Sequence, residues 1–259
     1  EGGATLSEIA AKKYTEISAS HPRWELSSDE SDEFSHWMSG TGDPGFEENQ
    51  KIEKAPLQKD QLAVWLRKPP STSLFQKDTW AEICRNHPSK AAFALRLLAQ
   101  ENTWPTERWR EAFHSWSQNS RLARFSWCMV AGFFSEIPEE PLRDIARSLT
   151  RWLQVVAEKG RKDKDTFYSL CNRMIELEVD GDGVDTDDPV MAARNHRTGG
   201  ATQAVITRWL ADKPKDNDEI PDTVETIFTS LCSSDKTQFV HGRVVLATYL
   251  ISLYRIDPE

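Results

Sequence analysis

The segment EVDGDGVDTDDP, residues 178–189, gathers five aspartates and two glycines in twelve residues, a composition that suits a calcium loop. An EF-hand loop needs a glycine at position 6 for its sharp turn and a bidentate glutamate at position 12. A loop that begins at Asp180 has Asp185 at position 6 and Met191 at position 12. A loop that begins two residues later has Val184 at position 3. Neither register therefore predicts an EF-hand.

Two interpretations of this acidic segment stay open. It is either a looser calcium loop or a charged surface loop between two helices, and we expect the surface loop, with no metal and no other cofactor. The candidate ligands of the first interpretation are Asp180, Asp182, Asp185 and Asp187. In the second, Asp187 or Asp188 caps the next helix and Pro189 takes its first position, where a proline loses no hydrogen bond.

The residues that could support nucleophilic catalysis are scattered along the sequence. Covalent catalysis needs a serine, cysteine or threonine beside an oriented base. The six histidines stand alone, without a G-x-S-x-G elbow, a P-loop, an H-E-x-x-H or a G-x-G-x-x-G motif. The sequence therefore predicts that this chain is not itself an enzyme.

Two polar clusters stand at the start of predicted helices. The first contains Asn195, His196 and Gly199, and the second contains His241 and Arg243. Glycine at such a place permits close approach of two backbones. The clusters predict either a hydrogen-bonded network that fixes helix ends or a contact with a ligand or partner, and both interpretations stay open.

The elements that must position these residues are predicted to be helices. Leu142, Ile145 and Leu149 begin a stripe with helical spacing that continues to Val156, and it predicts a helix over 141–159 with Pro141 at its first position. The same spacing recurs in five further groups: Trp109, Ala112, Phe113 and Trp116; Leu122, Phe125, Met129 and Phe133; Phe167, Leu170, Cys171 and Met174; Thr202, Val205, Ile206, Trp209 and Leu210; Val224, Ile227, Phe228, Leu231 and Cys232.

Short connections between these helices predict antiparallel neighbours. We expect an all-α fold, an irregular α-solenoid or multi-helix bundle of antiparallel helix pairs, over residues 59–259. Residues 239–259 are apolar almost all round and predict one helix buried on several sides. Residues 1–58 are rich in Ser, Gly, Asp and Glu, and they predict a loop-rich acidic arm or linker.

Composition restricts the environment and the partners. A net charge of −9 and a pI near 5.3 argue against nucleic acid as a partner. The longest uncharged apolar run, 244–254, is too short to span a membrane, and the first residues do not resemble a signal peptide. The four cysteines lie far apart in apolar stretches and predict reduced, buried thiols. We therefore expect a cytoplasmic chain with no membrane partner.

Four segments of the chain resemble a known kind of domain. Together they resemble the uncharacterised helical domain at the C-terminal end of large bacterial proteins that begin with a sirtuin-like domain. The similarity covers about residues 85–259, and Arg197 replaces a proline of that pattern. The segments are ENTWPTERWREAF at 101–113, PLRDIARSLTRWL at 141–153, NHRTGGATQAVITRWL at 195–210 and FVHGRVVLATYLISLYRIDPE at 239–259.

The resemblance implies that this chain is part of a larger protein that degrades NAD in anti-phage defence. It implies a non-catalytic sensor or regulatory module that binds a protein, namely its own enzyme domain, a phage protein or a second copy. Asn195 and His196 are not carried over as catalytic residues of the sirtuin fold. The rival predictions are a self-contained enzyme, a calcium-regulated helical domain and a purely structural scaffold.

Overall fold

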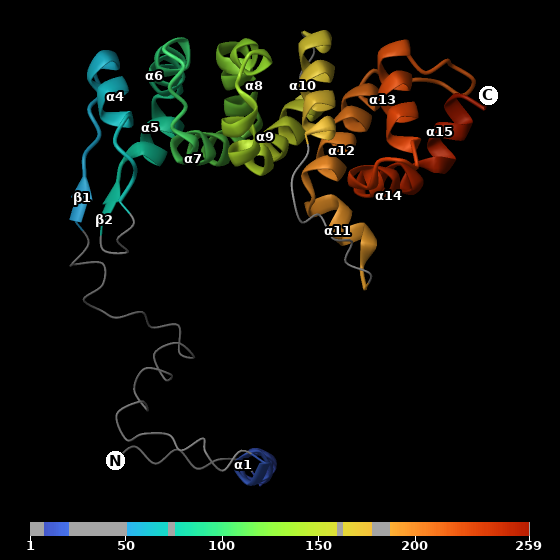
Figure 1. Cartoon of the computed structure of the whole chain (residues 1–259), viewed down its shortest axis with the longest axis horizontal. Helices are drawn as coiled ribbons and strands as arrows, with labels where there is room; N and C mark the ends of the chain where they lie inside the picture. The colour runs from blue at the N-terminus through green and yellow to red at the C-terminus, as the bar shows by residue number, and fades with distance from the viewer. Residues whose placement is uncertain (1–7, 21–50, 72–75, 160–162, 178–186, 259) are drawn as a thin grey trace. The chain divides into compact units, whose positions relative to one another are not determined.

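The computed structural model describes residues 8–20, 51–71, 76–159, 163–177 and 187–258. The chain divides into two compact units, Glu1–Lys51 and Ile52–Glu259. The first contains helix α1 (Glu8–Ser20), in a segment for which the sequence predicted no helix. The second contains the helices from α4 to α15 (Figure 1).

The described part of the second unit is predominantly helical. Two three-residue strands, β1 (Lys51–Glu53) and β2 (Gln76–Asp78), pair near its beginning. The helices of its first half are α4 (Lys59–Leu66), α5 (Trp80–Asn86), α6 (Pro88–Gln100), α7 (Thr106–Ser117), α8 (Ser120–Val130), the 3-10 helix η1 (Ala131–Ser135) and α9 (Glu139–Lys159). Those of its second half are α10 (Lys164–Glu176), α11 (Pro189–Asn195), α12 (Arg197–Leu210), α13 (Asp222–Cys232), the 3-10 helix η2 (Thr237–Phe239), α14 (Val240–Thr248) and α15 (Leu250–Ile256).

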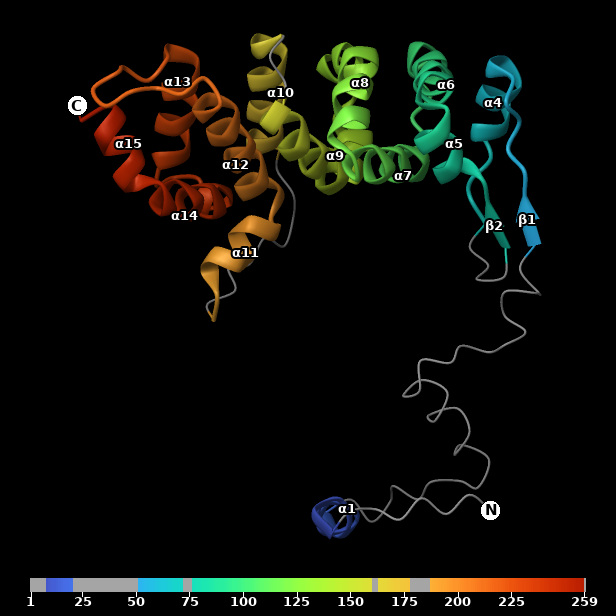
Figure 2. The ribbon, with the colours of Figure 1, turned by 180° about the vertical axis from the view of Figure 1, so that it is seen from behind.

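The helices α4 to α9 of this unit pack in two layers. In one layer α4 packs on α6 and α6 on α8, while in the other α5 packs on α7 and α7 on α9. Figure 1 shows α4, α6 and α8 standing side by side, and the view from behind shows the same order (Figure 2). Each helix from α4 to α7 thus contacts the next but one along the chain, as stacked helix pairs do. This arrangement confirms the predicted all-α fold.

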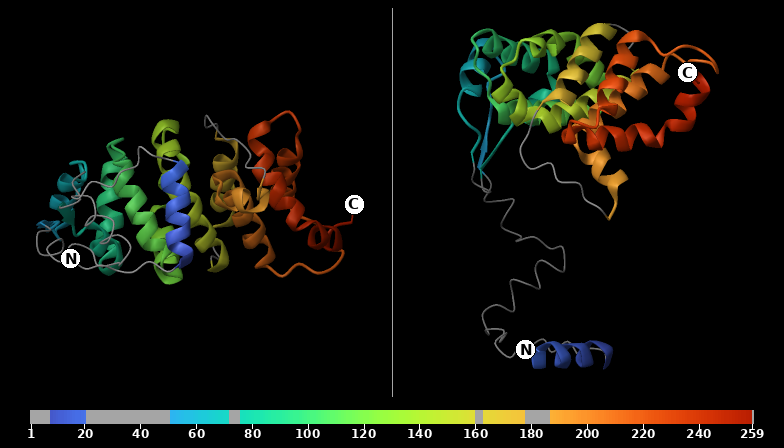
Figure 3. Two further views of the ribbon diagram at one scale, coloured as in Figure 1. Left: turned by 90° about the horizontal axis from the view of Figure 1, so that it is seen from below. Right: turned by 45° about the vertical axis from the view of Figure 1, so that its right-hand side comes forward.

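Helix α9 lies in the middle of the unit and packs against α7, α8 and α12. The view from below also shows it between its neighbours (Figure 3). Its predicted apolar stripe is buried as expected. The helix begins at Glu139, so Pro141 is its third residue rather than its first. The first turn has no intrahelical acceptor for its N–H groups, and it therefore tolerates proline at either place.

The stripe predicted for α8 is confirmed only in part, because Leu122 and Met129 are partly buried against the core while the fully buried face lies one position further along the helix. Ala123, Ser126, Trp127 and Val130 are buried, whereas Phe125 is 40% exposed. The indole of Trp127 packs on that of Trp152, with ring centroids 5.5 Å apart, and Trp152 Nε1 donates to Ser126 Oγ. The large tryptophan and its hydrogen-bonded neighbour therefore decide which face of α8 meets α9.

The single buried helix predicted for residues 239–259 is also wrong. The segment contains two helices, α14 and α15, which are separated at Tyr249. Tyr249 has φ −105° and ψ 4°, outside the helical range, and its hydroxyl accepts from Gln203 Nε2 at 2.8 Å. The turn leaves much of α15 exposed rather than buried.

Nowhere in the described ranges is a helix both long and apolar enough to cross a bilayer.

The cysteines follow the prediction only in part. Cys84 and Cys171 are buried, and burial raises the pKa of both thiols. Cys128 and Cys232 are exposed, because each lies on the outer side of its helix although its neighbours in sequence are apolar. An apolar stretch of sequence does not by itself fix which way each of its side chains points.

Candidate functional site

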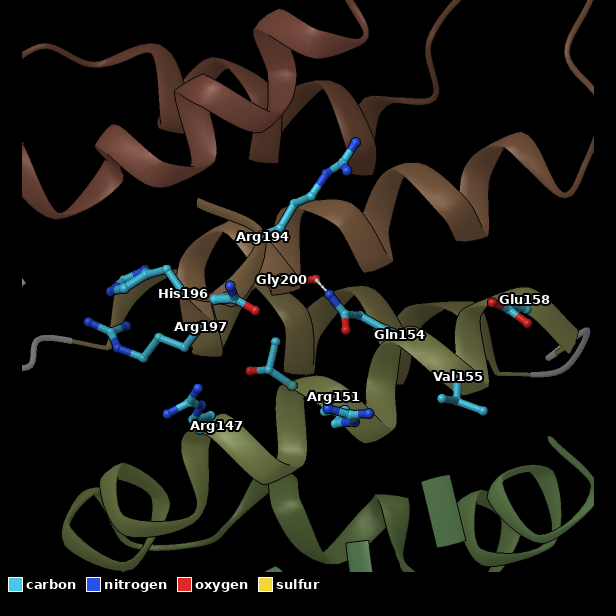
Figure 4. A pocket seen from close by; sticks show the side chains of 11 residues that line it. Arg147, Arg151, Gln154, Val155, Glu158, Arg194, His196, Arg197 and Gly200 are labelled. Carbon is cyan, nitrogen blue, oxygen red and sulfur yellow. Dashed lines mark hydrogen bonds between the residues drawn. The ribbon is translucent and has the colours of Figure 1, made fainter. Parts of the chain in front are cut away.

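A cavity opens between α9 and the junction of α11 with α12. Its volume is about 310 Å³, at the lower end of the range for small-molecule sites. Helix α9 supplies one side of the lining: Arg147, Thr150, Arg151, Gln154, Val155 and Glu158. The facing elements supply the other side: Arg194, Asn195, His196, Arg197 and Gly200. We call this cavity the arginine pocket (Figure 4).

Helix α9 places its polar residues in the pocket because its apolar residues occupy the core. Leu149 and Leu153 are fully buried. Arg147 and Arg151 lie one helical turn apart on another side, and both are exposed. The helix period therefore brings two guanidinium groups together at the opening of the cavity.

Helix α12 approaches α9 closely at Gly200. A Cβ atom at Gly200 would lie 2.8 Å from Thr150 Cγ2 and 3.1 Å from Gln154 Nε2. In the structure Gln154 Nε2 donates to the Gly200 carbonyl oxygen at 3.3 Å, as Figure 4 shows. The missing side chain thus sets the spacing of the two helices beside the pocket.

The junction between α11 and α12 is fixed by side-chain caps. Asp188 Oδ1 accepts from the Met191 backbone N–H at 2.9 Å, with Pro189 at the first position of α11. His196 ends α11 and caps α12, because its Nδ1 accepts from the Thr198 backbone N–H at 3.2 Å. Gly199 lies so near α11 that a Cβ atom there would be 2.0 Å from the Ala193 carbonyl oxygen.

The two polar clusters singled out from the sequence meet at one place. The rings of His196 and His241 stack with centroids 4.0 Å apart, and His241 is only 3% exposed. Arg243 does not reach the pocket, because its Nη1 donates to the carbonyl oxygens of Leu231 and Ser233 at the end of α13. Asn195 is exposed and lines the pocket.

The pocket collects positive charge. Among the described residues that line it, Glu158 is the single acid against four arginines. Arg197 is 7% exposed and its Nη1 donates to the Met174 carbonyl oxygen at 3.0 Å, which holds its side chain in place. Figure 4 shows Arg147 on α9 and Arg197 on α12 toward the same end of the cavity, whereas Arg194 extends away from them. The start of α12 adds the partial positive charge of a helix N-terminus.

Most of the aspartates of the acidic segment lie outside the described residues. This applies to Asp180, Asp182 and Asp185, while Asp187 is described and exposed. Within the described ranges no three His, Cys, Asp or Glu residues gather as metal ligands would. The looser calcium loop therefore stays an untested alternative.

Sequence reasoning missed the arginines of this site. Arg143, Arg147 and Arg151 repeat every four residues in PLRDIARSLTRWL, which places them along one face of a helix. That spacing was a usable signal. The position of Arg197 in the lining of the pocket could not be predicted from this spacing, because it depends on how α12 packs against α9.

Comparison with known proteins assigns no family to the chain. No family model, no curated protein and no solved structure matches it. The resemblance to the domain of sirtuin-like defence proteins therefore stays an expectation from the sequence.

Proposed function

We propose that this chain is a non-catalytic regulatory module that binds a protein, within a bacterial anti-phage protein that degrades NAD through a sirtuin-like domain. The four resembling segments supply the context. The observation that carries the protein-binding role is an apolar surface on α15. Leu250, Ile251 and Tyr254 on that helix are 64%, 79% and 66% exposed. We call these three side chains the α15 surface.

The α15 surface suits a protein partner for physical reasons. Large apolar side chains that gather at the surface mark interaction sites more often than isolated ones do. Leu250 and Tyr254 lie one turn apart on the helix, and Ile251 lies beside them. Burial of a leucine or isoleucine side chain contributes roughly 1.5–3 kcal/mol. Leu250 and Ile251, together with the ring of Tyr254, can therefore supply a useful part of a binding free energy.

The partner that we infer is the NAD-degrading domain of the same protein. A domain in the same chain is present at a high effective concentration, so a small surface is enough to hold it. Such a partner would also cover side chains that otherwise favour aggregation. A stacked helical array offers the extended surface on which a second domain can rest.

Capture experiments with purified proteins test this proposal. The sirtuin-like segment of the same protein, tagged and purified separately, should retain this chain. Ile251→Ser with Tyr254→Ser should abolish retention, because it removes two of the three apolar side chains of the α15 surface. The variant should still fold, since both side chains are exposed and lie outside the core. Val64→Ser is the matched control, since Val64 is 64% exposed on α4.

Three outcomes would contradict the proposal. The first is equal retention of the wild type and of the double variant. The second is a parent gene that encodes no sirtuin-like segment. The third is self-association of the chain through α15, measured by sedimentation, which would assign this surface to a second copy instead.

A further inference from the structure

We infer that the arginine pocket is a binding site for a small organic molecule that carries phosphate groups, such as a nucleoside diphosphate. The inference rests on the cavity between α9, α11 and α12 and not on the α15 surface. It therefore stands or falls separately from the proposed protein interaction.

The first support is a pair of cations that no described residue neutralises. Arg147 and Arg151 form no ion pair or hydrogen bond through their side chains within the described ranges, whereas Arg108 pairs with Asp78 at 2.7 Å. Two like charges one turn apart on a helix repel each other and destabilise it. An anion between them would remove that repulsion. The forked N–H donors of arginine match the oxygen atoms of phosphate.

The second support is a buried hydroxyl group. Thr150 lies between the two arginines in sequence, lines the same cavity and is 3% exposed. Its Oγ1 has no hydrogen-bond partner among the described residues. A buried polar atom that forms no hydrogen bond destabilises the folded state, and native proteins keep few of them. A ligand oxygen in the pocket would supply the missing partner once the Thr150 side chain turned its hydroxyl toward the cavity.

The third support is the orientation of α12. This helix of 14 residues begins at Arg197, at the edge of the pocket. The first N–H groups of a helix carry partial positive charge, which favours phosphate. The Thr198 N–H of α12 already donates to His196 Nδ1, so the helix contributes through its partial positive charge. Gly200 keeps this end of the helix close to Thr150, as the 2.8 Å approach of a Cβ atom there indicates.

The volume of the pocket and the net charge of the chain favour a small ligand over nucleic acid. A volume of about 310 Å³ is the volume that roughly ten water molecules occupy in the liquid. The pocket is therefore larger than a single phosphate ion needs. Nucleic-acid binding depends on an extended cationic surface, and the net charge of −9 opposes it. A phosphorylated small molecule fits both observations.

The test compares ligand binding of the full chain and of variants at constant ionic strength. The probes are ADP, pyrophosphate and inorganic phosphate in the millimolar range, with a single-stranded RNA oligonucleotide as the competing class. Thermal unfolding and titration calorimetry measure binding. We expect ADP and pyrophosphate to raise the melting temperature of the wild type.

The decisive variant is Arg147→Ala with Arg151→Ala. Both side chains are exposed, so the fold should survive, and each lost guanidinium should weaken binding roughly tenfold or more. The matched control is Arg121→Ala with Arg124→Ala on α8, which removes the same charge from exposed positions outside the pocket. Thr150→Val should raise the melting temperature of the free protein and weaken ADP binding.

Three results would overturn the inference. One is that none of the phosphate probes binds the wild type. Another is that the pocket variant and the α8 control bind ADP equally well. The last is that the RNA oligonucleotide binds while ADP and pyrophosphate do not, which would assign the site to nucleic acid.

Discussion

At the scale of single residues, two glycines differ sharply in what a side chain would meet. A Cβ atom at Gly199 would lie 2.0 Å from the Ala193 carbonyl oxygen, while none of the atoms around Gly132 comes within 4 Å of one. Gly199→Ala must therefore push α12 away from α11, and we expect the free energy of unfolding to fall by about 3 kcal/mol. Gly132→Ala should change it by less than about 1 kcal/mol. Urea unfolding of both variants measures the difference, and equal stabilities would refute the close approach.

The thiols allow a second prediction at this scale. Burial raises the pKa of Cys84 and Cys171, so both stay protonated and inaccessible at neutral pH. Cys128 and Cys232 are exposed. We expect Ellman's reagent to label two thiols quickly and the other two only after unfolding. Fast labelling that persists after Cys128→Ser with Cys232→Ser would contradict the structure.

At the scale of elements, an ion pair connects strand β2 to helix α7. Arg108 Nη1 lies 2.7 Å from Asp78 Oδ2, and the two side chains are 3% and 15% exposed. Asp78→Asn keeps the acceptor for the Trp80 backbone N–H but removes the nearer of the two carboxylates beside the buried guanidinium, since Glu111 Oε2 lies 3.6 Å from the same Nη1. We expect the unfolding free energy to fall by about 2 kcal/mol, as for loss of a hydrogen bond to a charged group.

The exposed pair between Arg255 and Asp216 provides the control for this prediction. Its side chains are 64% and 59% exposed, so water and salt screen the interaction. Asp216→Asn should leave the stability unchanged within error. Chemical unfolding in low and in high salt separates the two cases, and equal losses for both variants would contradict the difference in burial.

The elements also define what the sequence could predict. Helical periodicity was enough for α9, because a long helix with a continuous apolar stripe has one favourable orientation. It was only partly right for α8, where several apolar faces compete and Trp127 decides through its contact with Trp152. It failed at Tyr249 because a hydrogen bond from Gln203, 46 residues earlier, accompanies the turn. Such contacts between distant segments have no local signal.

The candidate site was predictable to a similar extent. The positions of Asn195 and His196 before a glycine-containing helix indicated a special junction, and the structure has one there. The arginines Arg147 and Arg151 have a recognisable four-residue spacing. The cavity itself depends on the packing of α12 on α9. That packing follows from tertiary contacts and could not be derived from either segment alone.

At the scale of the whole molecule, a buried tyrosine and two buried thiols lower the free energy of unfolding at alkaline pH. Burial raises the pKa of Tyr168 from its ordinary value of 10.0 to about 12, and it raises those of Cys84 and Cys171 above 9.0. Above these ordinary values the unfolded chain loses protons that the folded chain retains. Unfolding then releases protons, and the free energy of unfolding falls as pH rises.

Urea midpoints between about pH 7 and about pH 11 measure this dependence. The three groups are protonated in both states at neutral pH, so the loss should begin only as pH approaches 9.0. Tyr168→Phe should reduce the slope above its ordinary pKa of 10.0. A midpoint that stays constant over the whole range would contradict the burial of these groups.

The central claim is that the chain acts by binding and regulates an NAD-degrading partner. Its most direct test measures NAD consumption by the sirtuin-like segment that we propose for the same protein, purified alone and with this chain added. We predict that the chain alone consumes no NAD and that it changes the rate of the segment. Ile251→Ser with Tyr254→Ser should remove this effect, while Val64→Ser should retain it. NAD consumption by the chain alone, or a rate that the chain does not change, would contradict the claim.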